Sequence, residues 1–173
     1  FLEELAPLFN NLANLINLNL VPAGRAQLLP GAGFVCPNGA DQCDAMKLQA
    51  CALDAYWNDG NNYTDPIRQQ VFAYIVCTFK NKQMLGVMEA AEACATQNID
   101  PDAWIQMHAC ILEGTVNGIF NDYIEDTQSL VANVQNASIP IVLLNGFQVA
   151  DLATIRSQIC SYYVSSFANQ SLR

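Results

Sequence analysis

Apolar side chains recur every three or four positions through residues 2–16, close to the start of the chain. This spacing places them on one face of a helix, so an amphipathic helix is predicted here. Through residues 16–21 polar and apolar side chains alternate instead, and Pro22 and Gly24 follow. Such an alternation, stopped by a proline and a glycine, predicts a short strand.

Helical spacing dominates between residues 41 and 130. Two helix starts are marked by an aspartate followed by a proline, at Asp65-Pro66 and Asp100-Pro101. The aspartate supplies a side-chain acceptor at the N-cap, and the proline occupies the first helical position, where its missing N–H costs nothing. We expect helices near residues 43–57, 66–80, 82–97, 101–113 and 115–133.

The pattern returns to strand after residue 135. Two apolar runs, near 140–144 and 147–149, flank the dipeptide Asn145-Gly146, which tolerates the positive φ angles of a two-residue hairpin turn. Asp151 then stands where it can cap a closing helix. The order of helix, strand, block of helices, hairpin and helix predicts an α+β fold, with the helices inserted between strands.

Composition indicates one folded domain over residues 1–173, because 52% of the chain is apolar and 13% is charged. A net charge of −9, with scattered basic residues, disfavours nucleic acid and anionic membrane surfaces as partners. No apolar run approaches the roughly 20 residues that span a bilayer, so no membrane insertion is expected. The first residues lack the pattern of a signal peptide, which favours a soluble chain that has already been processed.

Seven cysteines favour an oxidising compartment, in which disulfides persist. Asn-x-Ser/Thr sequons at Asn62, Asn136 and Asn169 point the same way. We therefore expect a secreted glycoprotein with disulfide bonds, with a lysosomal location as the alternative.

The most informative segment is FVCPNGADQCDAMKLQAC, which holds Cys36, Gly39, Cys43 and Cys51. These four residues resemble, at identical spacings, the signature CQHGxxECxxNxxxxC of the gamma-interferon-inducible lysosomal thiol reductase (GILT) family. The polar companions of the signature differ. Its Gln, His, Glu and Asn are replaced by Pro37, Asn38, Gln42 and Met46.

The resemblance continues along nearly the whole chain, through LVPAG, YIVC, IPIVLLNG and QICSYY. It implies a thioredoxin-like core formed by residues 1–40 and 136–173, with a helical insertion over 41–135. It also implies a reduced sheet without its first strand, and a cis-proline at Pro140 beside the place of the reactive thiols. We therefore expect three core strands, near 16–21, 140–144 and 147–149.

Family members reduce disulfides with a Cys-x-x-Cys at a helix start, where the helix N-terminus activates one thiol and the second resolves the mixed disulfide. These 173 residues contain no such motif, and the resemblance places Phe1 just after it. Cys36 and Cys43 are flanked by Asp41 and Asp44, whose charges disfavour a thiolate. A structural disulfide is the better interpretation, and spacing leaves open whether Cys36 pairs with Cys43 or with Cys51.

Six cysteines are candidates for structural disulfides: Cys36, Cys43, Cys51, Cys77, Cys94 and Cys110. Cys160 is the candidate for the unpaired one, and we expect it to be a buried, inert thiol on an apolar helix face. His108 stands two residues before Cys110, so the two side chains would point in different directions on a helix and share no metal. The acids Asp122, Glu125 and Asp126 are typical of a solvated face. We expect no catalytic residue, metal or cofactor among these residues.

Two functions fit these observations. The first is a secreted GILT-like protein, similar to the salivary members found in insects, that has lost reductase activity and acts by binding other proteins, for example at a cell surface. The second is an active disulfide reductase of the family, whose Cys-x-x-Cys lies outside these residues.

Overall fold

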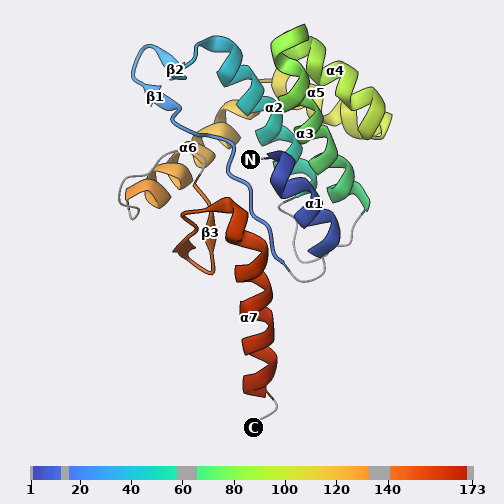
Figure 1. The fold of residues 1–173 in the computed structure, drawn as a ribbon. Helices are drawn as coiled ribbons and strands as arrows, with labels where there is room; N and C mark the ends of the chain where they lie inside the picture. Colours follow the sequence, from blue (N-terminus) through green and yellow to red (C-terminus); the bar gives the residue numbers. More distant parts are fainter. Residues whose placement is uncertain (1, 13–15, 58–65, 133–140, 171–173) are drawn as a thin grey trace.

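The computed structural model describes residues 2–12, 16–57, 66–132 and 141–170, except for the side chains of residues 2–4, 12, 82–83, 152 and 165–170. Its helices are α1 (Leu2–Leu12), α2 (Ala40–Tyr56), α3 (Pro66–Leu85), α4 (Val87–Asn98), α5 (Pro101–Leu112), α6 (Val116–Ala132) and α7 (Ile155–Gln170), and the short 3-10 helix η1 (Leu152–Thr154) precedes α7. Its strands are β1 (Gln27–Leu29), β2 (Gly33–Val35), β3 (Leu143–Leu144) and β4 (Phe147–Gln148). Figure 1 shows α1 to α6 gathered in one body, from which α7 projects.

Helix α2 lies at the centre of this body and contacts α3, α4, α5 and α6. Every residue from Leu48 to Leu53 is buried. A run of consecutive buried positions places buried side chains all around the helix, so α2 is enclosed by its neighbours rather than packed along one stripe. The predicted helix near 43–57 is confirmed as α2, and the structure makes it the central element of the core.

Helix α1 packs through an aromatic cluster. The ring of Phe9 lies 4.8 Å from that of Phe72 in α3 and 5.4 Å from that of Trp57, which follows α2. Tilted rings at these centroid separations are favourable beyond the apolar area that they bury. The helical pattern predicted near the start of the chain is thus confirmed over Leu2–Leu12.

The strand predicted over residues 16–21 is wrong. The side chains do alternate between half-buried and exposed, but the backbone has no strand partner. The main-chain oxygen of Leu18 instead accepts a hydrogen bond of 2.8 Å from the indole Nε1–H of Trp57. The segment runs extended over the helical core, and this explains why its pattern has the period of a strand.

The hairpin of β1 and β2 was not predicted. The two strands pair antiparallel, with Leu28 opposite Phe34. Pro30 and Gly31 form the turn, in which the Ala32 N–H donates to the Leu29 oxygen at 3.1 Å and Gly31 has φ 76°. Pro-Gly at these two positions is the sequence signal of a type II turn.

The second hairpin confirms its prediction. β3 and β4 pair antiparallel, with Leu144 opposite Phe147, and the turn residues Asn145 and Gly146 have φ of 51° and 85°. Positive φ at both turn positions is what an Asn-Gly dipeptide supplies.

The observed fold is α+β, as the sequence indicated, but the described residues hold two separate two-stranded hairpins and no sheet that joins them. The expected three-stranded core sheet is therefore not formed among these residues, and the thioredoxin-like core stays a prediction. None of the described helices is both long enough and apolar enough to cross a membrane.

The helix boundaries follow local chemistry. Asp100 accepts a hydrogen bond of 2.9 Å from the Asp102 N–H, and Pro101 is the first residue of α5, as predicted. The break between α3 and α4 lies at Gly86, which has φ 80°, and not near residue 81 as expected.

Candidate functional site

The loop that carries the signature cysteines is a closed turn at the start of α2. Cys36 and Cys43 form a disulfide, and their side chains are only 7% and 5% exposed. Between them Gly39 has φ 92° and ψ −174°, a conformation open essentially to glycine alone. The pairing that spacing left open is thus Cys36 with Cys43, in a loop whose backbone requires the glycine.

Two of the residues that depart from the signature, Gln42 and Met46, make contacts that the structure describes. The side chain of Gln42 accepts a hydrogen bond of 2.9 Å from the Asn38 backbone N–H, which stabilises the turn. Met46 packs against Gly24, where a Cβ atom would lie 2.7 Å from the methionine methyl carbon. Gln42 therefore stabilises the loop, whereas Met46 packs outside it, and neither side chain is an acid or a base that could activate a thiol.

The third signature cysteine, Cys51, pairs with Cys110 and so joins α2 to α5. Fifty-nine positions separate the two residues. The loss of loop entropy from the unfolded chain makes a crosslink of this length worth about 4 kcal/mol. This disulfide therefore stabilises the contact between the central helix and α5.

The remaining pair, Cys77 and Cys94, joins α3 to α4 across the turn between them. The amide Nδ2 of Asn81 lies 3.4 Å from the Cys77 sulfur, 3.6 Å from the Cys94 sulfur and 3.0 Å from the Cys77 main-chain oxygen. Asn81 thus holds the end of α3 against the disulfide.

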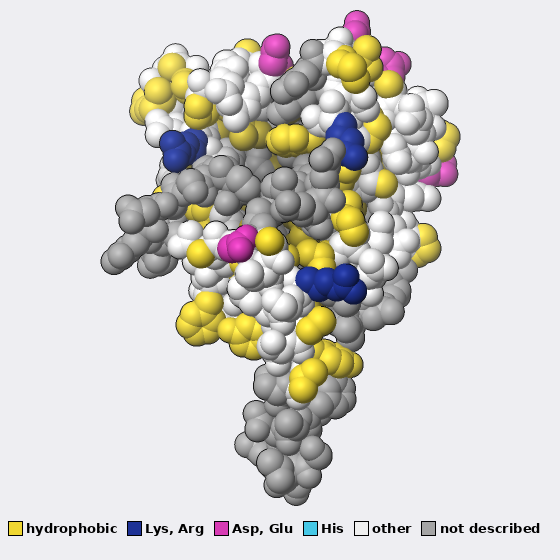
Figure 2. Space-filling view, in the orientation of Figure 1, with side chains coloured by type: hydrophobic (Ala, Val, Ile, Leu, Met, Phe, Trp, Pro, Cys, Tyr) yellow, Lys and Arg dark blue, Asp and Glu magenta, His cyan; other side chains and the backbone are white. Residues whose placement is uncertain are grey.

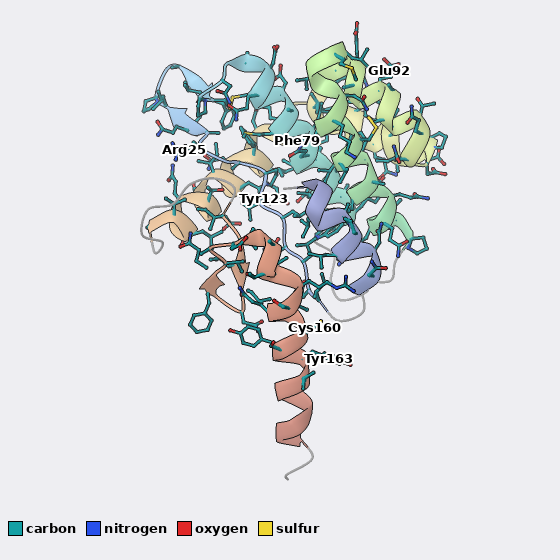
Figure 3. All side chains as sticks on the ribbon, viewed as in Figure 1. Arg25, Phe79, Glu92, Tyr123, Cys160 and Tyr163 are labelled. Carbon is teal, nitrogen blue, oxygen red and sulfur yellow. A yellow bond between two sulfur atoms is a disulfide. The ribbon has the colours of Figure 1, made fainter. Side chains whose placement is uncertain are left out.

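Cys160 is the free cysteine of the chain, as expected, but its expected burial is wrong. Figure 3 shows it on α7, and its side chain is exposed. The apolar face of α7 carries Ile155 and Ile159, which are 8% exposed each, and Cys160 points away from that face. The sequence pattern predicts Cys160 on the apolar face of this helix, but that face is formed by Ile155 and Ile159.

The polar candidates are placed as follows. His108 is half-buried and stacks on Trp104, with ring centroids 5.4 Å apart. Asp122, Glu125 and Asp126 are all exposed on α6. Within the described ranges no three His, Cys, Asp or Glu side chains converge as a metal site would require.

Several predicted residues fall where the structure gives no description. Pro140, the cis-proline expected from the resemblance, lies outside the described residues, as do the sequon asparagines Asn62 and Asn136. Asn169 lies within α7, but its side chain is outside the described part.

Exposed apolar side chains form a feature that the sequence analysis did not find. Around Gly86, where α3 meets α4, Met84 is 76% exposed, Leu85 43% and Met88 42%. We call these three residues the α3–α4 tip. Three neighbouring apolar side chains in water are typical of a contact surface, and methionine adapts its shape to different partners. The signal was present in the run Met-Leu-Gly-Val-Met, but the expected helix break nearer to residue 81 concealed it.

Charge is distributed unevenly over the surface. Figure 2 shows that the acidic side chains of this face lie mainly over the upper helices, whereas hydrophobic side chains follow the described part of α7. From residue 157 to residue 170 the sequence of α7 has no charged residue. The two ends of the molecule therefore present different chemistry to partners.

Comparison with known proteins agrees with the cysteine framework. The family model described as "Gamma interferon inducible lysosomal thiol reductase (GILT)" matches residues 1–98. A curated protein of Carassius auratus, "Gamma-interferon-inducible lysosomal thiol reductase", is 23% identical in an alignment of 169 residues that covers 93% of this chain and 61% of the relative. The chain thus spans less than two thirds of that relative's length. The cysteine signature and the family match together place this chain in the GILT family.

Proposed function

We propose that this GILT-family protein acts by binding other proteins and does not itself reduce disulfides. The observation that carries the proposal is the state of its thiols. Six of the seven cysteines are joined in three disulfides, and the seventh, Cys160, is alone.

Disulfide reduction needs two free thiols in reach of one another. The first attacks the substrate disulfide as a thiolate, forms a mixed disulfide and releases one substrate thiolate. The second then displaces the other substrate sulfur, so that the protein ends oxidised and the substrate reduced. Cys160 could carry out the first step but has no neighbour for the second among residues 1–173. Cys36 and Cys43 are already bonded and nearly buried, so a protein substrate would not reach them.

A binding role is supported by the helical insertion, which we propose spans residues 41–135 beside a core of residues 1–40 and 136–173. One disulfide joins α2 to α5 and another joins α3 to α4, and α2 packs against both α3 and α4. The α3–α4 tip projects three apolar side chains from this framework. A preorganised surface loses little conformational entropy on binding, which favours affinity.

The proposal includes an oxidising location. Three disulfides in 173 residues support a secreted protein, with the lysosome as the alternative. We propose glycosylation at Asn62, Asn136 and Asn169, which a mass shift on glycosidase treatment would test.

The reductase assay tests the proposal directly. The purified mature protein is incubated with a reduced thiol donor and a denatured disulfide-bonded substrate at about pH 4.5 and about pH 7, and released thiols are counted. We expect no turnover above the donor alone, and equal results for the protein and for Cys160→Ala. Turnover that alkylation of the protein's thiols abolishes would contradict the proposal.

A second candidate is an active disulfide reductase whose Cys-x-x-Cys lies in a part of the protein outside residues 1–173. It is favoured by the relative's name, which is that of a thiol reductase, and by the 61% of that relative which the chain spans. Intact mass and N-terminal sequencing of the mature protein separate the two candidates. A Cys-x-x-Cys upstream of Phe1, together with turnover, would establish the second.

A further inference from the structure

One side of helix α5 faces the core, where the helix packs against α2 and α4. Ala103 and Met107 are buried there, and Cys110 forms the disulfide to α2. These positions are spaced by four and three, so they lie along one side of the helix. A helix packed in this way normally carries polar side chains on its other side, which water contacts.

The other side of α5 is apolar as well. Ile105 is 63% exposed and Leu112 is 72% exposed. Between them lies His108, half-buried and stacked on the ring of Trp104, and Pro101 is exposed one turn before Ile105. We call Pro101, Ile105, His108 and Leu112 the α5 stripe, because their spacing of four, three and four places them in one row. An apolar row on the water side of a helix indicates a surface that a partner covers.

One edge of this stripe carries an acid near each end. Asp102 and Glu113 are exposed, and their separation of eleven positions places them on the same side of the helix, about 16 Å apart along its axis. Asp102 has a structural explanation, because negative charge is favourable at a helix N-terminus. Glu113 stands at the C-terminal end of α5, where negative charge opposes the helix macrodipole. A cation on a partner would supply what the helix itself does not offer to Glu113.

The acidic edge faces α2. Tyr56 of α2 donates a hydrogen bond of 2.9 Å to Gln106, which lies on the same edge. Burial raises the pKa of Tyr56, and the charges of Asp100 and Asp102 raise it further. The opposite edge of the stripe carries the ring of Trp104. The stripe therefore has one negative edge and one aromatic edge, which makes its chemistry directional.

We propose that the α5 stripe binds a cationic amphipathic helix of a partner protein. Apolar side chains spaced by three and four on that helix cover Ile105 and Leu112, and a Lys or Arg on its edge pairs with Glu113. Charge selects this occupant: a second copy would bring a further net charge of −9, and an anionic lipid surface would be repelled in the same way. The inference rests on the proposed binding role and gives the chemistry of one partner.

A model peptide tests the inference on the mature protein. The probe has about 16 residues of Leu, Lys and Ala, with Leu at helical spacings on one face and Lys along both edges of that face. Tryptophan emission reports its binding, because the peptide has no aromatic residue. Of the two tryptophans, Trp104 lies beside the stripe and is half-buried, whereas Trp57 is only 4% exposed. We expect a saturable blue shift as the peptide covers Trp104.

Two variants of the stripe are compared with matched controls. Ile105→Ser combined with Leu112→Ser should weaken binding by about 30-fold or more, because the apolar contact is lost. Glu113→Gln should weaken binding by about 3-fold and make it less sensitive to salt. Met84→Ser, at the 76% exposed Met84 of the α3–α4 tip, and Glu125→Gln, at an exposed acid of α6, should leave binding unchanged.

Four results would overturn the inference. They are the absence of a blue shift with up to about 1 mM peptide, binding that the double variant leaves unchanged, equal binding of a peptide with Glu in place of Lys, and a stripe occupied by something else. The last would appear as self-association, or as co-sedimentation with phosphatidylcholine vesicles, that the double variant abolishes. All four leave the proposed binding role to the α3–α4 tip, whereas turnover in the reductase assay contradicts that role itself.

Discussion

The helical block, residues 36–57 and 66–132, and the C-terminal region, residues 141–170, are held together in different ways. The block contains all three disulfides and most of the large buried cluster that includes Leu48, Tyr74 and Phe120. The C-terminal region has no disulfide, and its cluster of buried residues consists of Val149, Ile155 and Ile159. One region is crosslinked and densely packed, whereas the other depends on a few side chains.

This difference indicates where the molecule opens first. Local unfolding requires least free energy where few apolar contacts are lost, and the C-terminal region loses few. The block would stay folded while α7 and its hairpin detach. The helical block is thus the more stable region and the C-terminal region the more easily unfolded one. A substitution in the C-terminal region should leave the helical block folded.

The largest effect is expected from the disulfide that joins α2 to α5. Replacing both Cys51 and Cys110 by alanine should lower the free energy of unfolding by about 4 kcal/mol, because the unfolded chain regains the freedom of a long loop. Urea denaturation under non-reducing conditions, followed by circular dichroism, measures the change. Cys160→Ala is the control and should alter stability by less than about 0.5 kcal/mol, since this exposed thiol has no covalent partner. Equal losses of stability in the double variant and in Cys160→Ala would mean that this disulfide does not stabilise the helical block.

The next largest loss of stability is expected when one core side chain from each region is shortened to alanine. Leu53 in α2 is 1% exposed and Ile159 in α7 is 8% exposed. Leu53→Ala should cost about 4 kcal/mol of global stability, and Ile159→Ala about 2 kcal/mol, because the smaller cluster can collapse around the lost atoms.

Amide hydrogen exchange shows in which region each of these two substitutions acts. Ile159→Ala should speed exchange of the α7 amides and leave those of α2 unchanged, whereas Leu53→Ala should speed both. If Ile159→Ala accelerated exchange throughout α2, the two regions would unfold as one unit and the division between them would be wrong.

A smaller effect tests the backbone of the loop between Cys36 and Cys43. Gly39→Ala forces a side chain into φ 92°, ψ −174°, which should cost about 2 kcal/mol. Gly118→Ala is the matched control: Gly118 lies inside α6, and a Cβ there would meet no atom within 4 Å. That change should stabilise the protein by about 0.5 to 1 kcal/mol, since alanine favours a helix. Thermal unfolding of the two variants gives the sign of each change.

The sequence predicted those elements whose signals are local. Asp100-Pro101 starts a helix because the cap and the first position are adjacent, and Asn145-Gly146 turns a hairpin because two residues supply both positive φ angles. The cysteine spacing led to the family, since covalent frameworks preserve their spacing through large changes in other residues.

Features that depend on distant contacts were not predictable. Residues 16–21 alternate as a strand does, but what pairs with their backbone is the indole of Trp57, some forty positions away. The exposure of Cys160 depends on what packs against the outer half of α7, and the helical periodicity of α7 contains no such information. Pairing of Cys51 with Cys110 likewise follows from the packing of α2 on α5 and not from spacing.

The smallest effect at neutral pH is expected from Tyr74, in the middle of the helical block. Its side chain is fully buried, and its hydroxyl finds no hydrogen-bond partner among the described residues. The Thr78 hydroxyl nearby donates to the Tyr74 main-chain oxygen, at 2.9 Å. Tyr74→Phe removes a buried group without a partner, and should stabilise the protein by about 1 kcal/mol.

The same residue predicts a dependence on pH. Burial raises the pKa of the Tyr74 phenol well above its usual 10.0. Above about pH 10 the unfolded chain loses this proton while the folded chain keeps it, so the free energy of unfolding falls by up to about 1.4 kcal/mol per pH unit. Tyr74→Phe should therefore show a shallower loss of stability than the unmodified protein between about pH 9 and pH 11. The exposed tyrosine Tyr162 provides the control, because Tyr162→Phe should keep the steeper slope. Parallel slopes for Tyr74→Phe and the unmodified protein would mean that water reaches the phenol, and that the block is less tightly packed than its disulfides suggest.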